Sequence, residues 1–428
     1  MTRLGLRLFP ILLPCALVDV AHAQQSSGRS PPNIVFIMAD NLGYGEVGCY
    51  GGGILRGAPT PRIDALASQG LKLLNYNVES QCTPSRSALL TGRFPIRSGT
   101  VRVPRGEAAY GLTQWEITLA ELLAQQGYAT GHFGKWHLGD QQGRYPTDQG
   151  FDEWYGIPNS TSVSPWTSAV GFDPAVAPTP HIMEGRRGGS SRKVEPYDLR
   201  TRRLIDTEVT RRAVDFIRRH AQARRPMFCY VPFTLVHYPT LPHPDFAGKT
   251  GNGDWADALA EMDHHVGQIV DAVEQSGISD NTIVVFTSDN GPEEGNPYGG
   301  WAGPWSGSYF TALEGSLRVP FILRWPGQTP AGRVSNEIVH QVDVFTTFAA
   351  IAGAPLPYKH DPPQKLPLPR MHYLIDDPRE RHDVVAMNTW VYLPTNKIRD
   401  EFEASLRREP PIAVGTPDPY YPHQATGR

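Results

Sequence analysis

Two continuous apolar runs, each followed by the dipeptide Asp-Asn, constrain this chain most. Residues 33–39 read NIVFIMA and residues 282–288 read TIVVFTS, and the residues directly after them are Asp40, Asn41, Asp289 and Asn290. Unbroken apolar runs of this length predict strands buried on both faces, as in parallel sheets covered by helices. Ligands bind at the carboxyl ends of the strands in such sheets. We therefore expect a site where these polar residues meet.

Helical patterns alternate with further strands along the chain. The clearest spans residues 254–275, where apolar residues recur at steps of mostly three and four. Other helices are expected over residues 62–69, 118–126, 207–220 and 343–351, and other strands over 128–133, 227–233 and 319–324. This alternation predicts an α/β fold, with a large, mostly parallel sheet sandwiched between helices.

The beginning of the chain resembles a signal peptide. Arg3 and Arg7 precede a short apolar run, and Ala21-His22-Ala23 fits the small-x-small cleavage pattern. The run is shorter than the roughly 20 residues that span a membrane. We expect an exported protein without a membrane span, periplasmic or extracellular. The predicted divisions are a signal peptide (1–23), a flexible lead-in (24–32), the main α/β domain (33–353) and a shortened C-terminal subdomain or tail (354–428).

Charge and cysteine content exclude some classes of protein. The chain has 40 basic and 43 acidic side chains and a formal net charge of −3, so no nucleic-acid partner is expected. The arginine-rich stretch 186–225 is interpreted as a solvated face. Four cysteines do not make a disulfide framework. With Cys15 in the signal peptide, Cys49 and Cys229 are expected to be free thiols.

A candidate nucleophile lies in the sequence CTPSR at residues 82–86. Pro84 favours the start of a helix, with a proline at the first helical position. The free N–H groups at that start would face whatever Cys82 attacks, which favours an anionic group. Arg86 adds a guanidinium suited to a tetrahedral oxyanion. The structural alternative is a buried cysteine at the beginning of a helix.

Three motifs resemble those of the type I, formylglycine-dependent sulfatases of the alkaline phosphatase superfamily. They are CTPSRSALLTGR at 82–93, GKWHLG at 134–139 and GFD at 150–152. The resemblance implies an arylsulfatase-like sulfuric ester hydrolase acting on a small-molecule or saccharide sulfate ester. It also implies that a formylglycine-generating maturation enzyme oxidises Cys82 before the chain folds.

The resemblance further implies roles for individual residues. Hydrated formylglycine at position 82 would carry two hydroxyl groups, one of which attacks sulfur. Arg86 and Lys135 would stabilise charge on the sulfate oxygens, and His237 would protonate the leaving oxygen. His137 would help to eliminate sulfate afterwards. The substrate-binding positions that it implies are Ser160 and Tyr309.

The two Asp-Asn pairs predict a metal site. Carboxylate and amide oxygens are the ligands of hard cations, and their number favours Ca2+ over Mg2+. Each pair alone would also fit an ordinary turn after a strand. The resemblance adds residue 82 to the expected ligands, which are Asp40, Asn41, Cys82, Asp289 and Asn290.

Three departures from the family pattern stand out. Asn41 replaces a second aspartate, which removes one negative charge from the metal site. Tyr309 lies where the family has a lysine, so that a neutral donor replaces a cation. After residue 353 the family has a smaller domain with a four-stranded sheet and a helix, whereas this sequence predicts only a helix near residues 397–407 and lacks the intervening strands.

Some alternatives remain open from the sequence. The same superfamily contains phosphonate and phosphate monoester hydrolases, and a catalytically silent binding protein could keep the fold. Residues 162–197 are expected to form a long loop that lines the substrate entrance. Trp166, Trp301 and Trp305 fit a stacking role against the substrate as well as they fit a role in the core or lid.

Overall fold

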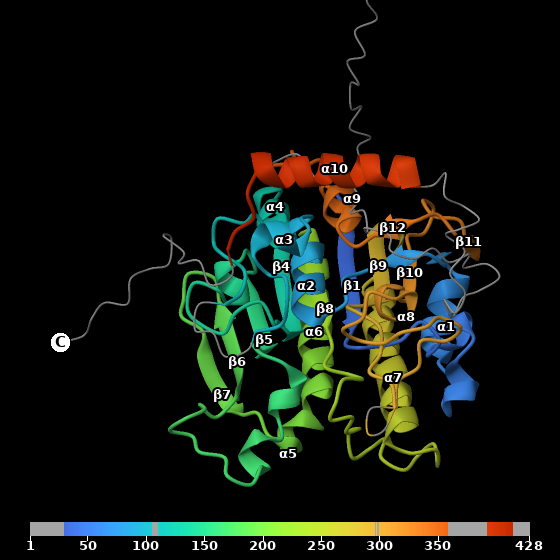
Figure 1. The fold of residues 1–428 in the computed structure, drawn as a ribbon. Helices are drawn as coiled ribbons and strands as arrows, with labels where there is room; N and C mark the ends of the chain where they lie inside the picture. The colour runs from blue at the N-terminus through green and yellow to red at the C-terminus, as the bar shows by residue number, and fades with distance from the viewer. Residues whose placement is uncertain (1–29, 105–109, 296, 298, 358–391, 414–428) are drawn as a thin grey trace, which may run out of the picture. The chain divides into compact units, whose positions relative to one another are not determined.

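The computed structural model describes residues 30–104, 110–295, 297, 299–357 and 392–413. Within these residues the main element is a ten-stranded sheet with the order β11-β2-β10-β9-β1-β8-β4-β5-β6-β7 (Figure 1). Its five central strands are parallel to one another. They are β9 (Thr282–Ser288), β1 (Asn33–Ala39), β8 (Met227–Pro232), β4 (Ala129–Lys135) and β5 (Glu153–Ile157).

Antiparallel strands extend this parallel centre on both sides. On one side β10 (Phe321–Arg324) is antiparallel to β9 and to β2 (Leu71–Leu73), and the edge strand β11 (Arg333–Ser335) is parallel to β2. On the other side β5 pairs with β6 (His181–Arg186), and β6 pairs with β7 (Arg192–Pro196). A separate two-stranded sheet joins β3 (Tyr76–Asn77) to β12 (Val339–His340).

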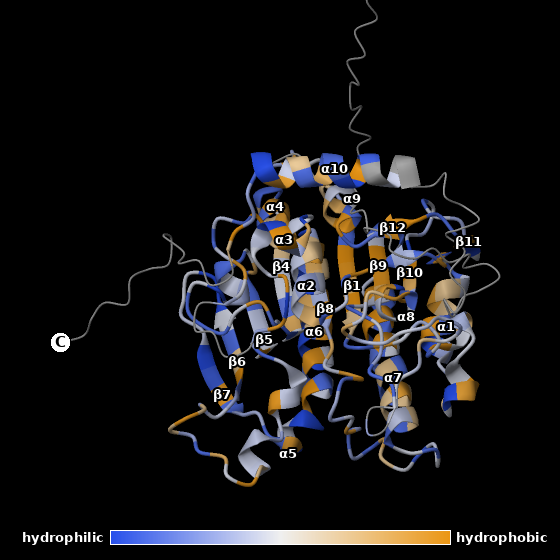
Figure 2. Ribbon diagram, viewed as in Figure 1, coloured by the Kyte–Doolittle hydropathy of each residue, from blue (hydrophilic) through white to orange (hydrophobic). Residues whose placement is uncertain are grey.

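Helices cover both faces of the sheet, because successive side chains of β1 point to opposite faces and both sets are apolar. Val35 and Ile37 face one apolar core, which contains the buried sides of α1 (Pro61–Ser68), α6 (Ile205–Gln222) and α7 (Asp254–Gln275). Ile34 and Phe36 face the other core, which contains those of α2 (Cys82–Thr91), α4 (Leu119–Gln125) and α9 (Asp343–Ile351). Figure 2 shows β1 and β9, at the centre of the sheet, as mostly hydrophobic.

The remaining helices are short, apart from α10. They are α3 (Pro95–Ser98), α5 (Leu199–Arg202), α8 (Glu314–Leu317) and the 3-10 turns η1 (Gly48–Tyr50), η2 (Gly53–Arg56), η3 (Pro146–Asp148), η4 (Thr161–Val163), η5 (Trp166–Ser168) and η6 (Ser279–Asn281). In the described residues no helix combines the length and the apolar character needed to cross a membrane.

The strands expected over 33–39 and 282–288 and the helices expected over 254–275 and 343–351 are confirmed at their bounds. The expectation of a long loop over residues 162–197 is wrong in its second half. Residues 181–196 form the hairpin β6–β7, which continues the sheet past β5. Its strands carry Arg and Glu side chains; β7 is largely exposed and only Ile182 and Met183 of β6 are buried, so the hairpin lacks the apolar pattern of a buried strand.

The arginine-rich stretch is mostly solvated, as expected. Arg211 and Arg212 pair with Glu208 on the exposed side of α6. Arg202 departs from the expectation because it is 1% exposed and forms hydrogen bonds inside the protein. Cys49 and Cys229 are free, as expected.

The described part of the C-terminal region is the helix α10 (Tyr392–Arg408), which begins earlier than expected. Figure 1 shows it lying across the upper end of the ribbon beside α9. Phe402 is buried there against Phe94, with the guanidinium of Arg97 5.7 Å from its ring centroid. The predicted signal peptide (1–23), most of the lead-in and the segment in which the family's further strands would lie (358–391) fall outside the described residues.

Candidate active site

The strand register brings the two Asp-Asn pairs together. Ala39 of β1 is the partner of Ser288 of β9, so the residues that follow, Asp40 and Asp289, leave the sheet side by side. The backbone N–H of Asn41 donates to Oδ1 of Asp289 at 3.0 Å, and Nδ2 of Asn290 donates to Oδ1 of Asn41 at 2.7 Å. All four residues are buried. The structure thus brings together the four strand-end residues that the sequence predicted.

Cys82 faces this cluster from the beginning of α2. Its side chain is 0% exposed, and four polar groups surround its sulfur. Their distances from Sγ are 3.3 Å for Lys135 Nζ, 3.4 Å for Tyr309 OH, 3.6 Å for Asn41 Oδ1 and 3.7 Å for Asp40 Oδ1. Burial raises the pKa of the Cys82 thiol, with Lys135 opposing this shift, so an unmodified thiol stays protonated at neutral pH.

The start of α2 differs from the expected one in detail. The helix begins at Cys82 itself, and Pro84 is its third residue instead of its first. This position still suits a proline, because the first turn of a helix has no intrahelical acceptor for its N–H groups. The helix therefore presents the side chain of Cys82 from its first residue.

Two buried cations balance the two buried carboxylates. Arg86 donates from Nε and Nη2 to Oδ2 of Asp289 at 3.0 and 2.7 Å. Lys135 donates to both oxygens of Asp40 at 2.9 and 2.7 Å. Burial alone would lower the pKa of Lys135, but the neighbouring Asp40, Cys82 and Asp289 together outweigh burial and raise that pKa. Lys135 is therefore a permanent positive charge beside Cys82.

Two histidines complete the arrangement. His137 follows β4 in a left-handed conformation (φ 59°), and Nδ1 of its buried ring has no hydrogen-bond partner among the residues that the structure describes. His237 follows β8, and a ring nitrogen lies within 4.8 Å of the ligand atoms of both Asp40 and Cys82. Burial, and then Lys135, lower the pKa of both histidines well below the usual value, so both rings are neutral in this state of the protein.

Asp40, Cys82 and His237 form a group that could hold a metal ion. A further possible metal ligand is Oδ1 of Asn290, which is buried and has no hydrogen-bond partner within the described part of the chain. An unpaired buried carbonyl oxygen is costly unless something binds it. The residues present therefore fit a cation that prefers oxygen ligands.

The hydroxyl groups of Ser160 and its neighbour Thr161 make different contacts. The hydroxyl of Ser160 accepts hydrogen bonds from the backbone N–H and the hydroxyl of Ser162 at the beginning of η4. The buried hydroxyl of Thr161 donates to Oδ2 of Asp40 at 3.1 Å. Thr161 was not predicted from the sequence. The available indication was that it carries a hydroxyl group and directly follows the candidate Ser160.

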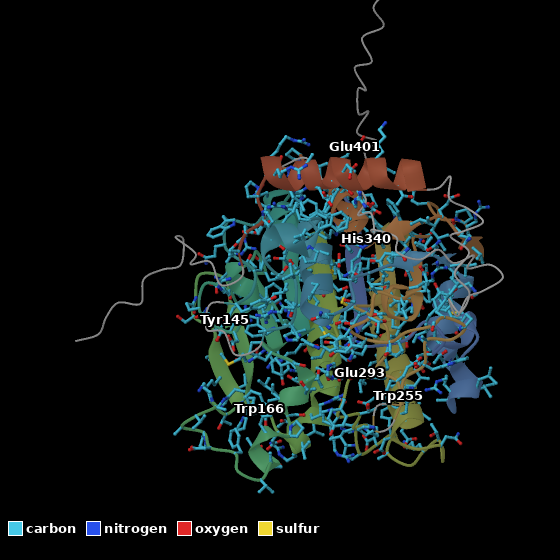
Figure 3. The ribbon with its side chains drawn as sticks, viewed as in Figure 1. Tyr145, Trp166, Trp255, Glu293, His340 and Glu401 are labelled. Carbon is cyan, nitrogen blue, oxygen red and sulfur yellow. The ribbon has the colours of Figure 1, made fainter. Side chains whose placement is uncertain are left out.

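The tryptophans divide between surface and interior. Trp166 is 40% exposed, in the loop at the lower side of Figure 3. Trp305 packs against Tyr44 and lies 4.1 Å from the guanidinium of Arg318, which favours the core interpretation for this residue. Trp301 is half-buried, and its backbone N–H donates to the buried carboxylate of Glu46.

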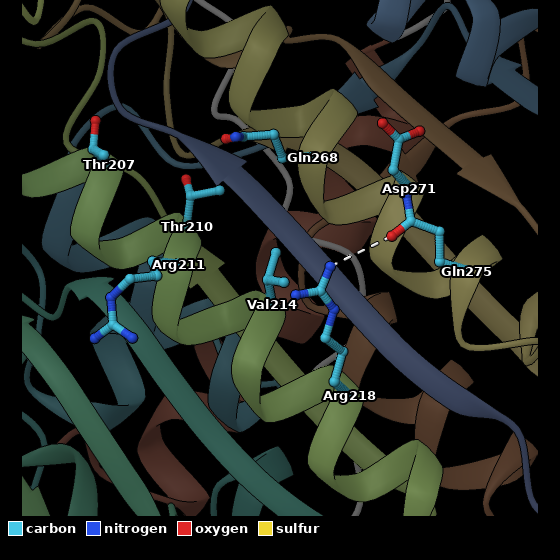
Figure 4. A pocket seen from close by; sticks show the side chains of 8 residues that line it. All are labelled: Thr207, Thr210, Arg211, Val214, Arg218, Gln268, Asp271 and Gln275. Carbon is cyan, nitrogen blue, oxygen red and sulfur yellow. Dashed lines mark hydrogen bonds between the residues drawn. The ribbon is translucent and has the colours of Figure 1, made fainter.

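Other candidates lie outside this cluster. His243, six positions after His237, contacts Asp245 and is not part of the metal-binding group found in the described residues. A groove of about 400 Å3 lies between α6 and α7 (Figure 4), and its lining contains none of the predicted site residues. That lining consists of Thr207, Thr210, Arg211, Val214, Arg218, Gln268, Asp271 and Gln275.

Comparisons with known proteins agree with this geometry. A family model described as sulfatase matches residues 32–354. Human arylsulfatase A is 39% identical over 344 residues, which cover 76% of this chain and 65% of that protein. N-acetylgalactosamine-6-sulfatase of the dog is 37% identical over 356 residues, covering 80% of this chain and 65% of the relative.

These alignments span slightly less than two thirds of either relative. A solved structure of a sulfatase from Pseudoalteromonas sp. superposes with a TM-score of 0.81 at 27% identity, covering 90% of this chain and 92% of that one. By its family match and its fold, this chain belongs to the sulfatase family.

Proposed function

We propose that this protein hydrolyses sulfate monoesters, with residue 82 as the nucleophile after its oxidation to formylglycine. The observation that carries the proposal is the surroundings of Cys82. A lysine, a tyrosine hydroxyl and the oxygens of Asn41 and Asp40 lie within 3.7 Å of its sulfur. A buried cation and hydrogen-bond donors around one small side chain suit a tetrahedral anion in contact with that side chain.

The oxidation has a chemical reason. An unmodified cysteine would form a thiosulfate intermediate and would have no second hydroxyl with which to expel sulfate. Hydrated formylglycine carries two hydroxyl groups on one carbon, so that one can attack and the other can drive elimination. The high pKa of the buried thiol also argues against direct attack by a thiolate.

Each charged residue receives a role from its position. Lys135 and Arg86 hold positive charge next to the position of the sulfate oxygens, and Asp40 and Asp289 orient these two cations. His237 lies close enough to residue 82 to protonate the leaving oxygen once the bound anion restores its basicity. His137, with a free buried Nδ1, accepts the proton that is lost when sulfate is eliminated.

The oxygens of Asp40, Asn41, Asp289 and Asn290, together with residue 82, would hold the metal ion, which we propose to be calcium rather than magnesium. When bound, the ion would lower the pKa of the attacking hydroxyl. His237 belongs to the geometric cluster, but in this proposal it is the proton donor and not a ligand.

The proposed substrates are sulfate esters of saccharides or phenols. The curated names of two relatives, arylsulfatase A and N-acetylgalactosamine-6-sulfatase, support these two classes. Tyr309 supports sulfate over phosphate, because a neutral donor beside residue 82 adds no charge to balance the second negative charge of a phosphate monoester.

The decisive experiment combines a mass measurement with an assay. The tryptic peptide 73–86, taken from protein made in a host that matures sulfatases, should show the mass loss of formylglycine relative to the encoded cysteine. The same protein should hydrolyse 4-nitrophenyl sulfate faster than 4-nitrophenyl phosphate, and Cys82→Ala should hydrolyse neither. Preference for phosphate would favour a phosphate monoester hydrolase. An unmodified Cys82 without turnover of either ester would favour a silent binding protein.

We also propose that residues 1–23 direct export and are removed. N-terminal sequencing of protein recovered outside the cytoplasm should begin at Gln24. Retention of the first 23 residues, or recovery from the cytoplasm alone, would contradict this part of the proposal.

A further inference from the structure

The segment that carries His237 has a buried arginine behind it. Arg202, the last residue of α5, is 1% exposed. Its guanidinium donates to the carbonyl of His237 at 3.1 Å, to the carbonyl of Pro239 at 3.1 Å and to the hydroxyl of Thr234 at 3.0 Å. One rigid planar group therefore contacts the segment 234–239 at three positions.

Asp206, on the first turn of α6, contacts both Arg202 and the segment 234–239. Its carboxylate accepts hydrogen bonds from the backbone N–H and the hydroxyl of Thr234, and Oδ2 lies 3.7 Å from Nη1 of Arg202. Both side chains are buried, so the pair is not weakened by solvent. Removing the arginine would leave three carbonyl oxygens of the segment, those of Thr234, His237 and Pro239, without this donor and one carboxylate without its cation.

The orientation of the His237 ring depends on this backbone. Nδ1 of His237 lies 2.6 Å from the carbonyl oxygen of Tyr238. A carbonyl oxygen can only accept a hydrogen bond, so Nδ1 carries the hydrogen and Nε2 is left for the site. The carbonyl of Tyr238 lies between those of His237 and Pro239, to which Arg202 donates. A shift of this backbone would therefore turn the ring and break the hydrogen bond that fixes its tautomer.

We propose that Arg202, held by Asp206, is a positioning residue that aims His237 at the leaving oxygen of the sulfate ester. The inference rests on the proposed function for the chemistry of His237. The contacts through which Arg202 would act are all with residues 234–239.

The kinetic test uses Arg202→Met, Arg202→Lys and a matched control. Arg324→Met also removes a buried arginine paired with an acid, Glu274, but it lies in β10 away from the cluster. Each variant is assayed on aryl sulfates whose phenols range from acidic to weakly acidic. A phenol that is a poor leaving group depends most on protonation.

For Arg202→Met we expect kcat to fall about 3-fold with 4-nitrophenyl sulfate and about 50-fold with phenyl sulfate, with KM within about 2-fold of wild type. Arg202→Lys should recover part of the loss. Arg324→Met should leave the dependence of kcat on the acidity of the phenol unchanged. Equal losses of kcat across all phenols, or the same change of this dependence in Arg324→Met, would overturn the proposal.

A second measurement does not require turnover. Nitrogen NMR of labelled histidine rings distinguishes the two tautomers, and His237→Gln identifies the signals of His237. We expect the Nδ1–H tautomer in wild type and in Arg324→Met, and its loss in Arg202→Met. An unchanged tautomer in Arg202→Met would overturn the positioning role. If wild type hydrolyses no sulfate ester, the proposed function fails, while this measurement still decides whether Arg202 orients the ring.

Discussion

The hydroxyl of Tyr309 lies 3.4 Å from the sulfur of Cys82, so a phenol is a direct neighbour of the candidate nucleophile. Burial raises the pKa of Tyr309 well above its usual value, and the neighbouring Cys82 adds to the shift. The phenol therefore remains neutral and can donate one hydrogen bond. The positive charge beside residue 82 comes from Lys135 and Arg86, both of which are already paired with carboxylates.

Replacing Tyr309 tests what a neutral donor does at this position. Tyr309→Phe removes one hydrogen bond to the bound anion and should lower kcat/KM for 4-nitrophenyl sulfate about 10-fold. Tyr309→Lys adds a cation and should raise the ratio of phosphate to sulfate ester hydrolysis, because the phosphate ester carries the greater negative charge. Steady-state kinetics on both esters measure this ratio. An unchanged ratio in Tyr309→Lys would show that this position does not discriminate by charge.

Asn41→Asp should strengthen metal binding. A charged carboxylate would replace the neutral amide whose oxygen lies 3.6 Å from Cys82 Sγ, and we expect the dissociation constant for Ca2+ to fall about tenfold or more. Isothermal titration calorimetry on metal-free protein measures it. Asn281→Asp is the matched control, because it makes the same change of charge just before β9, at the opposite end of the strand from Asp289. Equal or weaker binding in Asn41→Asp would be the contrary result.

Thr161→Val should weaken catalysis without unfolding the protein. The variant keeps the shape of the side chain but removes the hydroxyl that donates to Oδ2 of Asp40. Loss of a hydrogen bond to a charged group typically costs about 1.5–3 kcal/mol, and we expect at least a 10-fold loss of kcat/KM. Thr161→Ser keeps the hydroxyl and should retain most of the activity. Wild-type kinetics in Thr161→Val would exclude a contribution from this contact.

His132 should make the protein less stable in acid. Its ring lies among Trp136, Phe151 and Tyr230, with centroids 5.3–5.4 Å away, and burial, assisted by Arg86, lowers its pKa to about 3. Between this value and the unfolded pKa near 6.5, the unfolded state binds more protons, so stability is lost as the pH falls below about 6.5. At pH 5 the loss from His132 amounts to about 2 kcal/mol.

His132→Phe removes this titration and keeps an aromatic ring. Urea unfolding at pH 8 and pH 5 should show a drop in the free energy of unfolding that is about 2 kcal/mol smaller than in wild type. Equal decreases in the free energy of unfolding of the two proteins would mean that protonation of His132 does not destabilise the fold.

Phe402→Ala tests whether α10 belongs to the same cooperative unit as the catalytic residues. Truncating this buried ring against Phe94 should cost about 3 kcal/mol. If the helix folds with the sheet, the whole protein should unfold at lower denaturant. Glu401→Ala, at an exposed position on the same helix (Figure 3), is the control. An unchanged main transition would support a separate C-terminal subdomain beginning near residue 354.

The sequence was most informative where burial imposes a pattern. Residues 33–39 and 282–288 lie between two layers of helices, so all positions after Asn33 are apolar or small, and their bounds could be read directly. The helix 254–275 was equally clear, because only one side faces the sheet. The polar residues after the strands followed from the same reasoning, since strand ends in a parallel sheet share an edge.

What could not be predicted depends on contacts between distant residues. The hairpin β6–β7 is held by backbone pairing, and its charged side chains give no periodic pattern. Arg202 looks like its surface neighbours in the sequence, and only the fold shows three acceptors around it. Thr161 was missed for the same reason, because its contact with Asp40 joins residues 121 positions apart.

The pairing of Ala39 with Ser288 has a consequence for how this protein can fail. A slip of one residue between β1 and β9 would keep the number of paired strands but turn every side chain of one strand to the other face. Asp40 would then no longer face Asp289, and Arg86, which contacts both carboxylates, would lose one of its two partners. Hydrolysis would therefore report on the alignment of two strands, and a protein with normal helix content but a misaligned sheet would be inactive.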